Sequence, residues 1–242
     1  MPALPSVAAL LGWNGQHANI ADKSSATSRR ISADVLQILG VTTQVTHTGQ
    51  TAGKALEQAV HDHLSSAMPS TLNGRAVTVS RKTVVSDFEQ YEHLAQLQHL
   101  IDIDDTKTLR ASIGSDYLVK PDVTVGLAPV SGSPLLHAAV PCKWTLRSDR
   151  AQNVRHEAVI LIRHRRGRLP HITPVTAEPM PTRLASLARG TAEVDALYHV
   201  ALDELTTAVN NSGTREQIEV LEELVHHHRL RDLAELVPIL LL

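Results

Sequence analysis

The period of the hydrophobic pattern changes twice along this chain of 242 residues. Apolar residues recur at helical spacing in the N-terminal part, short apolar runs typical of strands fill the middle, and helical spacing returns near the C-terminus. The sequence contains no internal repeat, no low-complexity tract and no linker long enough to separate two folding units. These features predict one α/β domain over residues 1–242, with a mixed central β-sheet flanked by helices.

The expected elements follow from the same pattern. Pro121 and Pro141 interrupt two of the expected strands, and this predicts bends or bulges because proline cannot donate to a central ladder. The expected helices cover 28–39, 50–68, 87–101, 193–209, 214–228 and 230–236, and the expected strands cover 117–125, 135–146, 158–163 and 171–177.

Composition excludes several classes of protein. The chain has one Phe, two Trp and three Tyr residues, too few for a base-stacking platform that binds single strands. Cys142 is the single cysteine, so no intrachain disulfide can form and a reducing cytosol is the expected compartment. The N-terminus does not resemble a signal peptide, and no run approaches the roughly 18–20 apolar residues of a membrane span. We therefore expect a soluble cytoplasmic protein without a membrane partner.

The charge distribution points to a polyanion site. The formal net charge of −2 argues, taken alone, against a DNA-binding protein. Residues 143–168, however, carry eight Lys or Arg and two Asp or Glu, and eight minus two gives a local charge of +6. Such a block is expected where a protein binds DNA, although a solvated charged face has the same composition. Motifs must decide between these two interpretations.

An acidic residue in one strand and a lysine in the next form the outline of a nuclease site. Asp122 follows Pro121 in one expected strand, and Lys143 follows Cys142 in another. This is the PD-(D/E)xK pattern, in which carboxylates hold Mg²⁺ while Lys positions or activates water and offsets phosphate charge. The usual carboxylate two residues before Lys is replaced by Pro141. Glu157 and Glu57 are the two candidates for the missing acid.

Three runs of sequence resemble the NgoMIV-like group of type II restriction endonucleases, which recognise CCGG-containing sites and belong to the PD-(D/E)xK superfamily. The runs occur in the family's order and span much of the chain. They are GQTAGKALE at 49–57, PCKWTLRSDRAQN at 141–153 and PMPTRLASL at 179–187. The resemblance implies a restriction-endonuclease-like core, Mg²⁺ as cofactor, and a cognate methyltransferase encoded elsewhere.

The resemblance also implies a role for each site residue. In that family the displaced carboxylate follows the lysine, a position that Glu157 matches, and a further glutamate comes from an upstream helix, which Glu57 matches. Asp122 should bridge the metal ions, and the main-chain carbonyl of Cys142 should complete the site with the two glutamates. Lys143 should lie beside the attacking water. The Cys142 thiol is interpreted as a small buried group without a chemical role.

A cluster four residues beyond Lys143 has the chemistry to read G·C pairs. Arg147 and Arg150 can each donate two hydrogen bonds to guanine O6 and N7, and Asp149 can accept from cytosine N4. One cluster can read two adjacent G·C pairs, so a two-fold dimer would read CCGG in double-stranded DNA. A surface ion-pair network is the alternative, and the position of the cluster in the resembling family favours base reading.

Three further residues are expected to contact DNA. Gln50 lies seven positions before Glu57, two helical turns, so both side chains share one face of a helix. The resemblance implies that Gln50 contacts the minor groove while Glu57 lies at the metal, and a capping or solvent-exposed glutamine is the alternative. Arg183 matches the position that reads an outer G·C pair in the resembling family, although a phosphate contact is the alternative, and Asp22 is its expected partner. Together they extend the site to GCCGGC, and the family implies cleavage before the first C of CCGG, leaving four-base 5′ overhangs.

The sequence departs from the family between Asp122 and Lys143. These residues are 21 positions apart, whereas the family typically carries a longer insertion here that contributes to tetramer assembly. We therefore expect a homodimer rather than a tetramer.

Two other functions agree with part of this sequence pattern. A PD-(D/E)xK nuclease that recognises DNA structure would need no base-edge readers. A DNA-binding protein without catalysis would leave the two glutamates, the aspartate and the lysine unexplained, and it would bind without Mg²⁺ and never nick.

Overall fold

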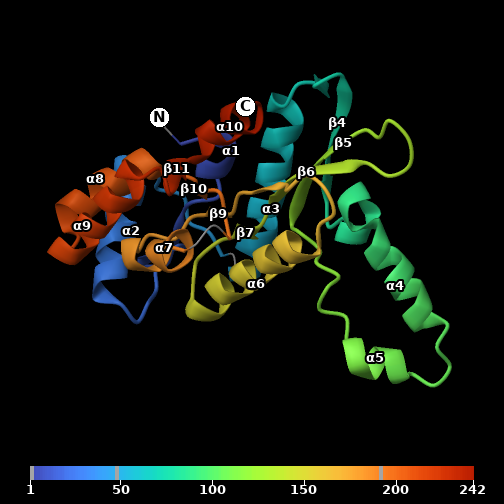
Figure 1. Cartoon of the computed structure of the whole chain (residues 1–242). Helices are drawn as coiled ribbons and strands as arrows, with labels where there is room; N and C mark the ends of the chain where they lie inside the picture. The colour runs from blue at the N-terminus through green and yellow to red at the C-terminus, as the bar shows by residue number, and fades with distance from the viewer. Residues whose placement is uncertain (1–2, 47–48, 191–192) are drawn as a thin grey trace.

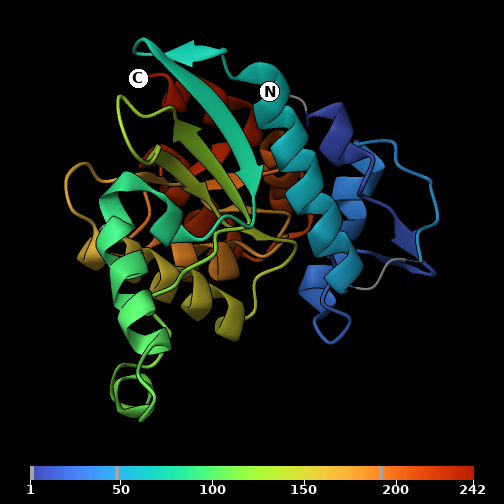
Figure 2. The same ribbon diagram turned by 90° about the vertical axis from the view of Figure 1, so that its right-hand side faces the viewer.

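The structure is a computed structural model that describes residues 3–46, 49–190 and 193–242. Figure 1 shows two sheets in the body of the molecule with helices packed around them. Helices α4 (Glu92–Asp102) and α5 (Thr108–Ile113) extend away from this body, as both views show (Figures 1 and 2). No helix of the described ranges is long and apolar enough to cross a bilayer.

The remaining elements alternate along the chain as a mixed α/β protein. The other helices are α1 (Pro5–Ala8), α2 (Ala26–Ile38), α3 (Gly49–Ala67), α6 (Ser148–His164), α7 (Pro181–Ala188), α8 (Leu202–Ser212), α9 (Arg215–His226) and α10 (Leu236–Leu240), with 3-10 turns at Val85–Asp87, Glu89–Tyr91 and Leu233–Glu235. The strands are β1 (Trp13–Asn14), β2 (His17–Ala18), β3 (Thr71–Leu72), β4 (Arg75–Arg81), β5 (Val123–Leu127), β6 (Leu135–Val140), β7 (Cys142–Lys143), β8 (His171–Ile172), β9 (Val175–Thr176), β10 (Leu197–His199) and β11 (Leu230–Asp232).

Two sheets form the centre of the fold. The order of the larger sheet is β3-β4-β5-β6-β8, antiparallel except for the parallel pair β6 and β8. The smaller sheet, in the order β11-β10-β9-β7, is parallel throughout. Helix α3 contacts β4, β5 and β7, and so covers parts of both sheets. The predicted fold class, a mixed sheet system flanked by helices, is confirmed.

Pro141 marks the point where the chain passes from one sheet to the other. Strand β6 ends at Val140 in the larger sheet, and β7 begins at Cys142 in the smaller one. Proline has no N–H to contribute to a ladder, but its carbonyl accepts from the Val175 N–H of the new sheet at 2.8 Å. The bend predicted from Pro141 is confirmed, and it places Cys142 and Lys143 where the two sheets meet.

Helix α6 joins the two hydrophobic cores. Ala151 and Val154 in its first half belong to the larger core, and Ala158 and Leu161 in its second half belong to the smaller core beside α4. The prediction of a strand over 158–163 is therefore wrong. The apolar residues at 151, 154, 158 and 161 follow helical spacing, and a short apolar run cannot by itself distinguish a buried helix from a buried strand.

Two predicted C-terminal helices also prove to begin as strands. The helix expected over 193–209 is divided into β10, the buried strand between β9 and β11, and the helix α8. The helix expected over 230–236 begins as β11 and continues as a 3-10 turn. Strands of three residues are too short to show a period of their own, so tertiary pairing decides their structure.

Candidate active site

Asp122 and Lys143 lie side by side, as their places in neighbouring strands predict. Asp122 immediately precedes β5, and β7 begins one residue after β6, the antiparallel neighbour of β5. The main-chain N–H of Cys142 donates to Asp122 Oδ2 at 2.7 Å, and Lys143 Nζ donates to the same oxygen at 2.9 Å. The other carboxylate oxygen, Oδ1, receives no hydrogen bond from a described residue. It is therefore available to a ligand.

The charge on Lys143 is stabilised by its partner. Burial of the side chain disfavours the ammonium form, but the Asp122 carboxylate, its hydrogen bond and the Glu157 charge together outweigh this effect and raise the pKa of Lys143 above its ordinary value. Lys143 is thus a fixed cation at neutral pH. Such a group can offset charge on a phosphate and hold a water molecule, but it cannot accept a proton while it is protonated.

Glu157 faces the same pair from helix α6. Burial raises the pKa of its carboxyl above the usual range, and the nearby Asp122 charge adds to this effect, while Lys143 opposes it. No described residue forms a hydrogen bond or ion pair with Glu157. A half-buried carboxylate in this situation gains stability from a cation placed between it and Asp122.

Glu57 approaches from helix α3. Its side chain is 14% exposed, and it forms an ion pair with Arg81 at the end of β4, with Arg81 Nη2 and Glu57 Oε2 3.3 Å apart. Glu57 is close enough for its charge to act on the Cys142 thiol, together with the charges of Asp122 and Lys143. The four predicted catalytic side chains therefore occupy one region, with Glu57 held by an arginine that the sequence did not identify.

The Cys142 thiol is buried and not reactive. Burial raises the pKa of the thiol well above its ordinary value, and the neighbouring Asp122 charge raises it further. Its sulfur lies 3.6 Å from the Val140 carbonyl oxygen, to which the thiol donates. The thiolate form is disfavoured, which agrees with the interpretation of Cys142 as a small packed residue.

The donors in this region fit a hard divalent cation. Mg²⁺ prefers oxygen ligands, and Asp122, Glu157 and Glu57 supply carboxylate oxygens here. Glu157 forms no hydrogen bond with a described residue, and Asp122 keeps Oδ1 free of hydrogen bonds from described residues. Within the described ranges, no group of three or more His, Cys, Asp or Glu side chains is gathered closely enough to hold a metal. The donors are chemically suited to Mg²⁺, but Glu57 forms an ion pair with Arg81 in this structure.

The expected base readers lie at the N-terminus of helix α6. Arg147 is the N-cap residue, and Asp149 and Arg150 are in the first turn. Arg147 and Asp149 are exposed, whereas Arg150 is held by two 3.1 Å hydrogen bonds from its Nη1 to the Thr145 carbonyl and hydroxyl oxygens. The N-terminus of a helix carries partial positive charge, which favours the approach of a polyanion.

Arg183 and Asp22 are brought together, although 161 positions separate them. Arg183 Nη2 donates to Asp22 Oδ2, and this bond lowers the pKa of Asp22 well below its usual range, with Ser24 contributing further hydrogen bonds. Asp22 and Arg147 line both of two adjoining hollows, one of about 500 Å³ and one of about 380 Å³. Arg150 lines the first of these hollows and Arg183 the second, so three expected arginine readers lie along adjoining hollows, whereas Asp149 lines neither.

The structure separates the basic block into two parts. Lys143 and the reading cluster lie at one end of α6, and the arginines of residues 163–168 lie at the other. Helix α6 has 17 residues, and the sixteen steps between its ends, at about 1.5 Å each, place these ends about 24 Å apart. Gln50, in the first turn of α3, is exposed, and no described contact joins it to the other expected readers.

Sequence reasoning missed two residues of this region, Arg81 and Glu178. Arg81 closes β4 and pairs with Glu57. Glu178 is fully buried between β9 and α7 and contacts Arg183. Neither residue belongs to a recognisable motif, and the sequence gives no sign that Glu178 is buried, since an isolated glutamate is usually exposed.

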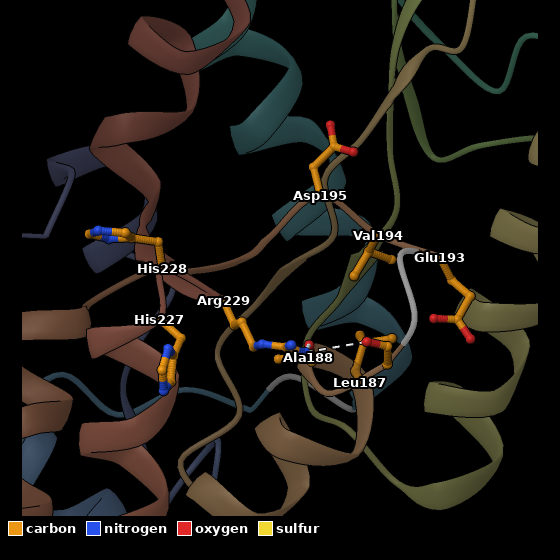
Figure 3. A pocket seen from close by; sticks show the side chains of 9 residues that line it. Leu187, Ala188, Glu193, Val194, Asp195, His227, His228 and Arg229 are labelled. Carbon is orange, nitrogen blue, oxygen red and sulfur yellow. Dashed lines mark hydrogen bonds between the residues drawn. The ribbon is translucent and has the colours of Figure 1, made fainter.

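A separate pocket is lined by the end of α7 and by residues 193–195 and 227–229, and none of the expected site residues lines it (Figure 3). It has a volume of about 420 Å³, and its walls include Asp195, His227, His228 and Arg229. The two histidine side chains point in different directions, away from Asp195, and Arg229 donates to the carbonyl oxygen of Ala188 at 3.4 Å (Figure 3). The charged groups do not converge on one point, so the pocket does not form a second reactive site.

The sequence matches one family over nearly all of its length. The family described as NgoMIV restriction enzyme matches residues 9–133 and 128–241. The type II restriction enzyme NgoMIV of Neisseria gonorrhoeae is 34% identical over 250 residues, which cover 89% of this chain and 87% of that protein.

Two solved structures share a more distant similarity. A complex of restriction endonuclease PspGI with substrate DNA has a TM-score of 0.41 and 12% identity, covering 79% of this chain and 61% of that chain. A pre-specific complex of restriction endonuclease BsaWI with DNA has a TM-score of 0.31 and 10% identity, covering 74% and 65%. In both cases this chain spans less than two thirds of the solved chain.

Proposed function

The chain belongs to the NgoMIV restriction enzyme family, as its resemblance predicted, and on this basis we propose that it is a Mg²⁺-dependent endonuclease that cuts both strands of DNA at GCCGGC. One observation carries the proposal. Helix α6 bears Arg147, Asp149 and Arg150 at its start and Glu157 further along, next to the Asp122–Lys143 pair. A single rigid element therefore connects base reading to the chemical site.

The residues around Asp122 divide the work of phosphodiester hydrolysis. Asp122, Glu157, Glu57 and the Cys142 carbonyl are the residues that would hold Mg²⁺, and the ion would polarise the phosphate and lower the pKa of water. Lys143, kept cationic by Asp122, holds the attacking water and offsets negative charge that develops on the phosphate. The Cys142 thiol stays protonated and takes no part in the reaction.

The reading residues follow the donors and acceptors of G·C pairs. Arg147 and Arg150 donate to guanine edges in the major groove, and Asp149 accepts from cytosine N4. Arg183 reads the outer G·C pair with Asp22, which holds the guanidinium through their ion pair. Gln50, exposed at the start of α3, contacts the minor groove.

The assembly we propose is a homodimer. A palindrome is read by two copies of the same cluster related by a two-fold axis. The connection between β5 and β6 is only residues 128–134, where the family typically carries an insertion that contributes to a tetramer. Each protomer cuts one strand before the first C of CCGG, which leaves four-base 5′ overhangs.

Digestion of defined DNA tests the proposal. Purified protein is incubated, with and without Mg²⁺, with unmethylated duplexes that carry GCCGGC, ACCGGT or a scrambled site, and the ends are sequenced. We expect cleavage at GCCGGC only when Mg²⁺ is present. Equal cleavage of ACCGGT would remove the outer-base assignment, and cleavage of the scrambled site would indicate a structure-specific nuclease. Binding without any cleavage in Mg²⁺ would reduce the protein to a DNA binder.

Asp122→Asn is the matched inactive control for this digestion. The substitution keeps the size of the side chain and removes the charge that faces Lys143. Arg215→Ala, on an exposed ion pair with Glu219 within α9, is the control for nonspecific effects of substitution. Contaminating nuclease would cut equally in the Asp122→Asn preparation.

A further inference from the structure

A buried carboxylate lies behind the expected base readers and has no role in the chemistry described above. Glu178 follows β9 and precedes α7, and its side chain is 1% exposed. Burial of a carboxylate is unfavourable unless hydrogen bonds and charges compensate for lost water. The hydrogen-bond and ion-pair partners of Glu178 therefore indicate its structural role.

Each oxygen of Glu178 holds the entry to a different helix. Oε2 accepts from the Leu146 N–H at 2.8 Å, one residue before the N-cap of α6. Oε1 accepts from the Met180 N–H at 3.1 Å, the N-cap residue of α7. One rigid group thus fixes the starting points of the two helices that carry Arg147 at the N-cap of α6 and Arg183 in the first turn of α7.

The same carboxylate also contacts an expected reader directly. Arg183 Nη1 lies 3.8 Å from Glu178 Oε1, while Arg183 Nη2 binds Asp22. The guanidinium is therefore held between an inner buried acid and an outer one, with 31% of its side chain exposed. A guanidinium with two carboxylate partners has few rotamers available, which favours a defined direction toward its target.

We propose that Glu178 is a positioning residue that fixes Arg183 relative to the first turn of α6, so that discrimination at the base pairs flanking CCGG depends on it. The inference rests on the proposed function, because it assigns Arg183 and Asp22 to the outer pairs. It goes beyond that function in naming the group that couples outer reading to inner reading. Glu178 touches no DNA and acts through Leu146, Met180 and Arg183.

Two variants test this role in complementary ways. Glu178→Gln keeps the length of the side chain but replaces one acceptor by an amide N–H donor, so one of the two helix-entry bonds is lost. Glu178→Asp keeps the charge but is one methylene shorter, so it cannot reach both N–H groups and Arg183. Thermal melting first establishes whether each variant is folded. If Glu178→Gln does not fold, the cleavage test is made with Glu178→Asp.

A buried carboxylate elsewhere in the chain supplies the matched control. Asp232 is 3% exposed and accepts from Ala234 N at 2.9 Å and from Leu202 N at 3.2 Å, far from the reading cluster in sequence and at the other edge of the smaller sheet. Asp232→Asn removes the same kind of hydrogen bond. If Asp232→Asn lowers stability but keeps specificity, a loss of specificity in the Glu178 variants is not a general effect of lower stability.

The readout is the ratio of cleavage rates on GCCGGC and ACCGGT. For folded Glu178 variants we expect this ratio to fall about 10-fold or more, because one misread base pair typically changes discrimination by that order. Asp232→Asn should leave the ratio of the wild-type protein unchanged. Hydrogen exchange should accelerate at residues 146–151 and 180–184 in the Glu178 variants only.

The outcomes separate the two proposals. If the wild-type protein does not cut GCCGGC in Mg²⁺, the proposed function fails and the specificity role of Glu178 fails with it. If the wild-type protein cuts and discriminates, while folded Glu178 variants keep the full ratio, only the role of Glu178 is overturned. A fall in the ratio that Asp232→Asn reproduces also overturns it, because the effect then belongs to general stability.

Discussion

Lys143 donates to Asp122 Oδ2 at 2.9 Å, and the main-chain N–H next to Lys143 donates to the same oxygen. A single carboxylate oxygen thus fixes both the lysine side chain and the strand that carries it. The position of Pro141, at the junction of the two sheets, brings β7 back to Asp122 at this point. The proline that replaces the usual carboxylate therefore supports the geometry of the site while removing one ligand.

Asp122→Asn should lower the cleavage rate strongly while preserving DNA binding. The substitution removes the negative charge that binds Lys143 Nζ, together with one carboxylate ligand for the ion. We expect the cleavage rate to fall by about 10²–10⁴-fold, because a bound metal ion stabilises transition-state charge by several kcal/mol, and binding measured by fluorescence anisotropy in Ca²⁺ to change by less than about threefold. Single-turnover cleavage of a GCCGGC duplex measures the first quantity. A variant that cleaves at the wild-type rate would exclude Asp122 from the catalytic site.

Arg81→Gln should lower the Mg²⁺ concentration required for half-maximal cleavage. Arg81 forms an ion pair with the Glu57 carboxylate and adds positive charge beside the expected metal position. Both effects oppose the binding of a cation. A half-buried pair of this kind contributes on the order of 1 kcal/mol, which corresponds to a shift of a few-fold. Arg75, on the same strand and near Glu89, provides the control substitution. A higher Mg²⁺ requirement in Arg81→Gln would mean that Arg81 positions Glu57 for the ion rather than competing with it.

The sequence predicted the parts of the site that depend on local order. Asp122 and Lys143 fall in consecutive expected strands, and the three expected readers fall within four residues, so a short pattern places them together. Helix α3 was also predicted from its apolar spacing, and its length carries Glu57 toward β7. The position of Glu57 beside β7 is a contact between distant segments, and only the family resemblance predicted it.

Relationships that depend on tertiary packing could not be predicted in this way. The run at 158–163 has the composition of a buried strand, and its helical state follows from contact with two cores. Arg81 reaches Glu57 only because β4 lies beside α3. Glu178 is buried because β9 and α7 enclose it, and nothing in its neighbouring residues distinguishes it from a surface glutamate.

Arg183→Gln should relax discrimination at the outer base pairs without loss of the CCGG core. The guanidinium can donate to guanine, and Asp22 holds it in place, whereas a glutamine is shorter and uncharged. Loss of one good base contact costs about 1–3 kcal/mol, so the ratio of rates on GCCGGC and ACCGGT should fall by roughly 5- to 150-fold. Arg189→Gln, on the exposed pair with Glu223 after α7, is the control. If Arg183→Gln weakens binding to both sites equally, Arg183 contacts a phosphate instead.

Stability should depend on pH through Glu178. Burial raises the pKa of this carboxyl to about 7, against the opposing effects of the Leu146 N–H and of Arg183, with Asp22 and His199 nearby. The folded state therefore binds this proton more tightly than the unfolded chain, so its contribution to stability is complete below about pH 4.5 and is lost as the pH rises through 7. The free energy of unfolding of the wild-type protein minus that of Glu178→Gln should fall over this interval. Urea unfolding at pH 5, 6, 7 and 8 measures it, and a constant difference would contradict the prediction.

The native protein should be a dimer that cuts a single site at full rate. The seven residues between β5 and β6 form a short connection, and this short connection is the observation behind the proposed dimer. Light scattering should therefore give the mass of two 26.3 kDa chains, with or without a GCCGGC duplex. Plasmids with one site and with two sites should be cut at rates within about twofold of each other, because no second site is needed to assemble an active complex. Strong activation by a second site, or a mass of four chains, would show that another surface of the protein replaces the missing insertion.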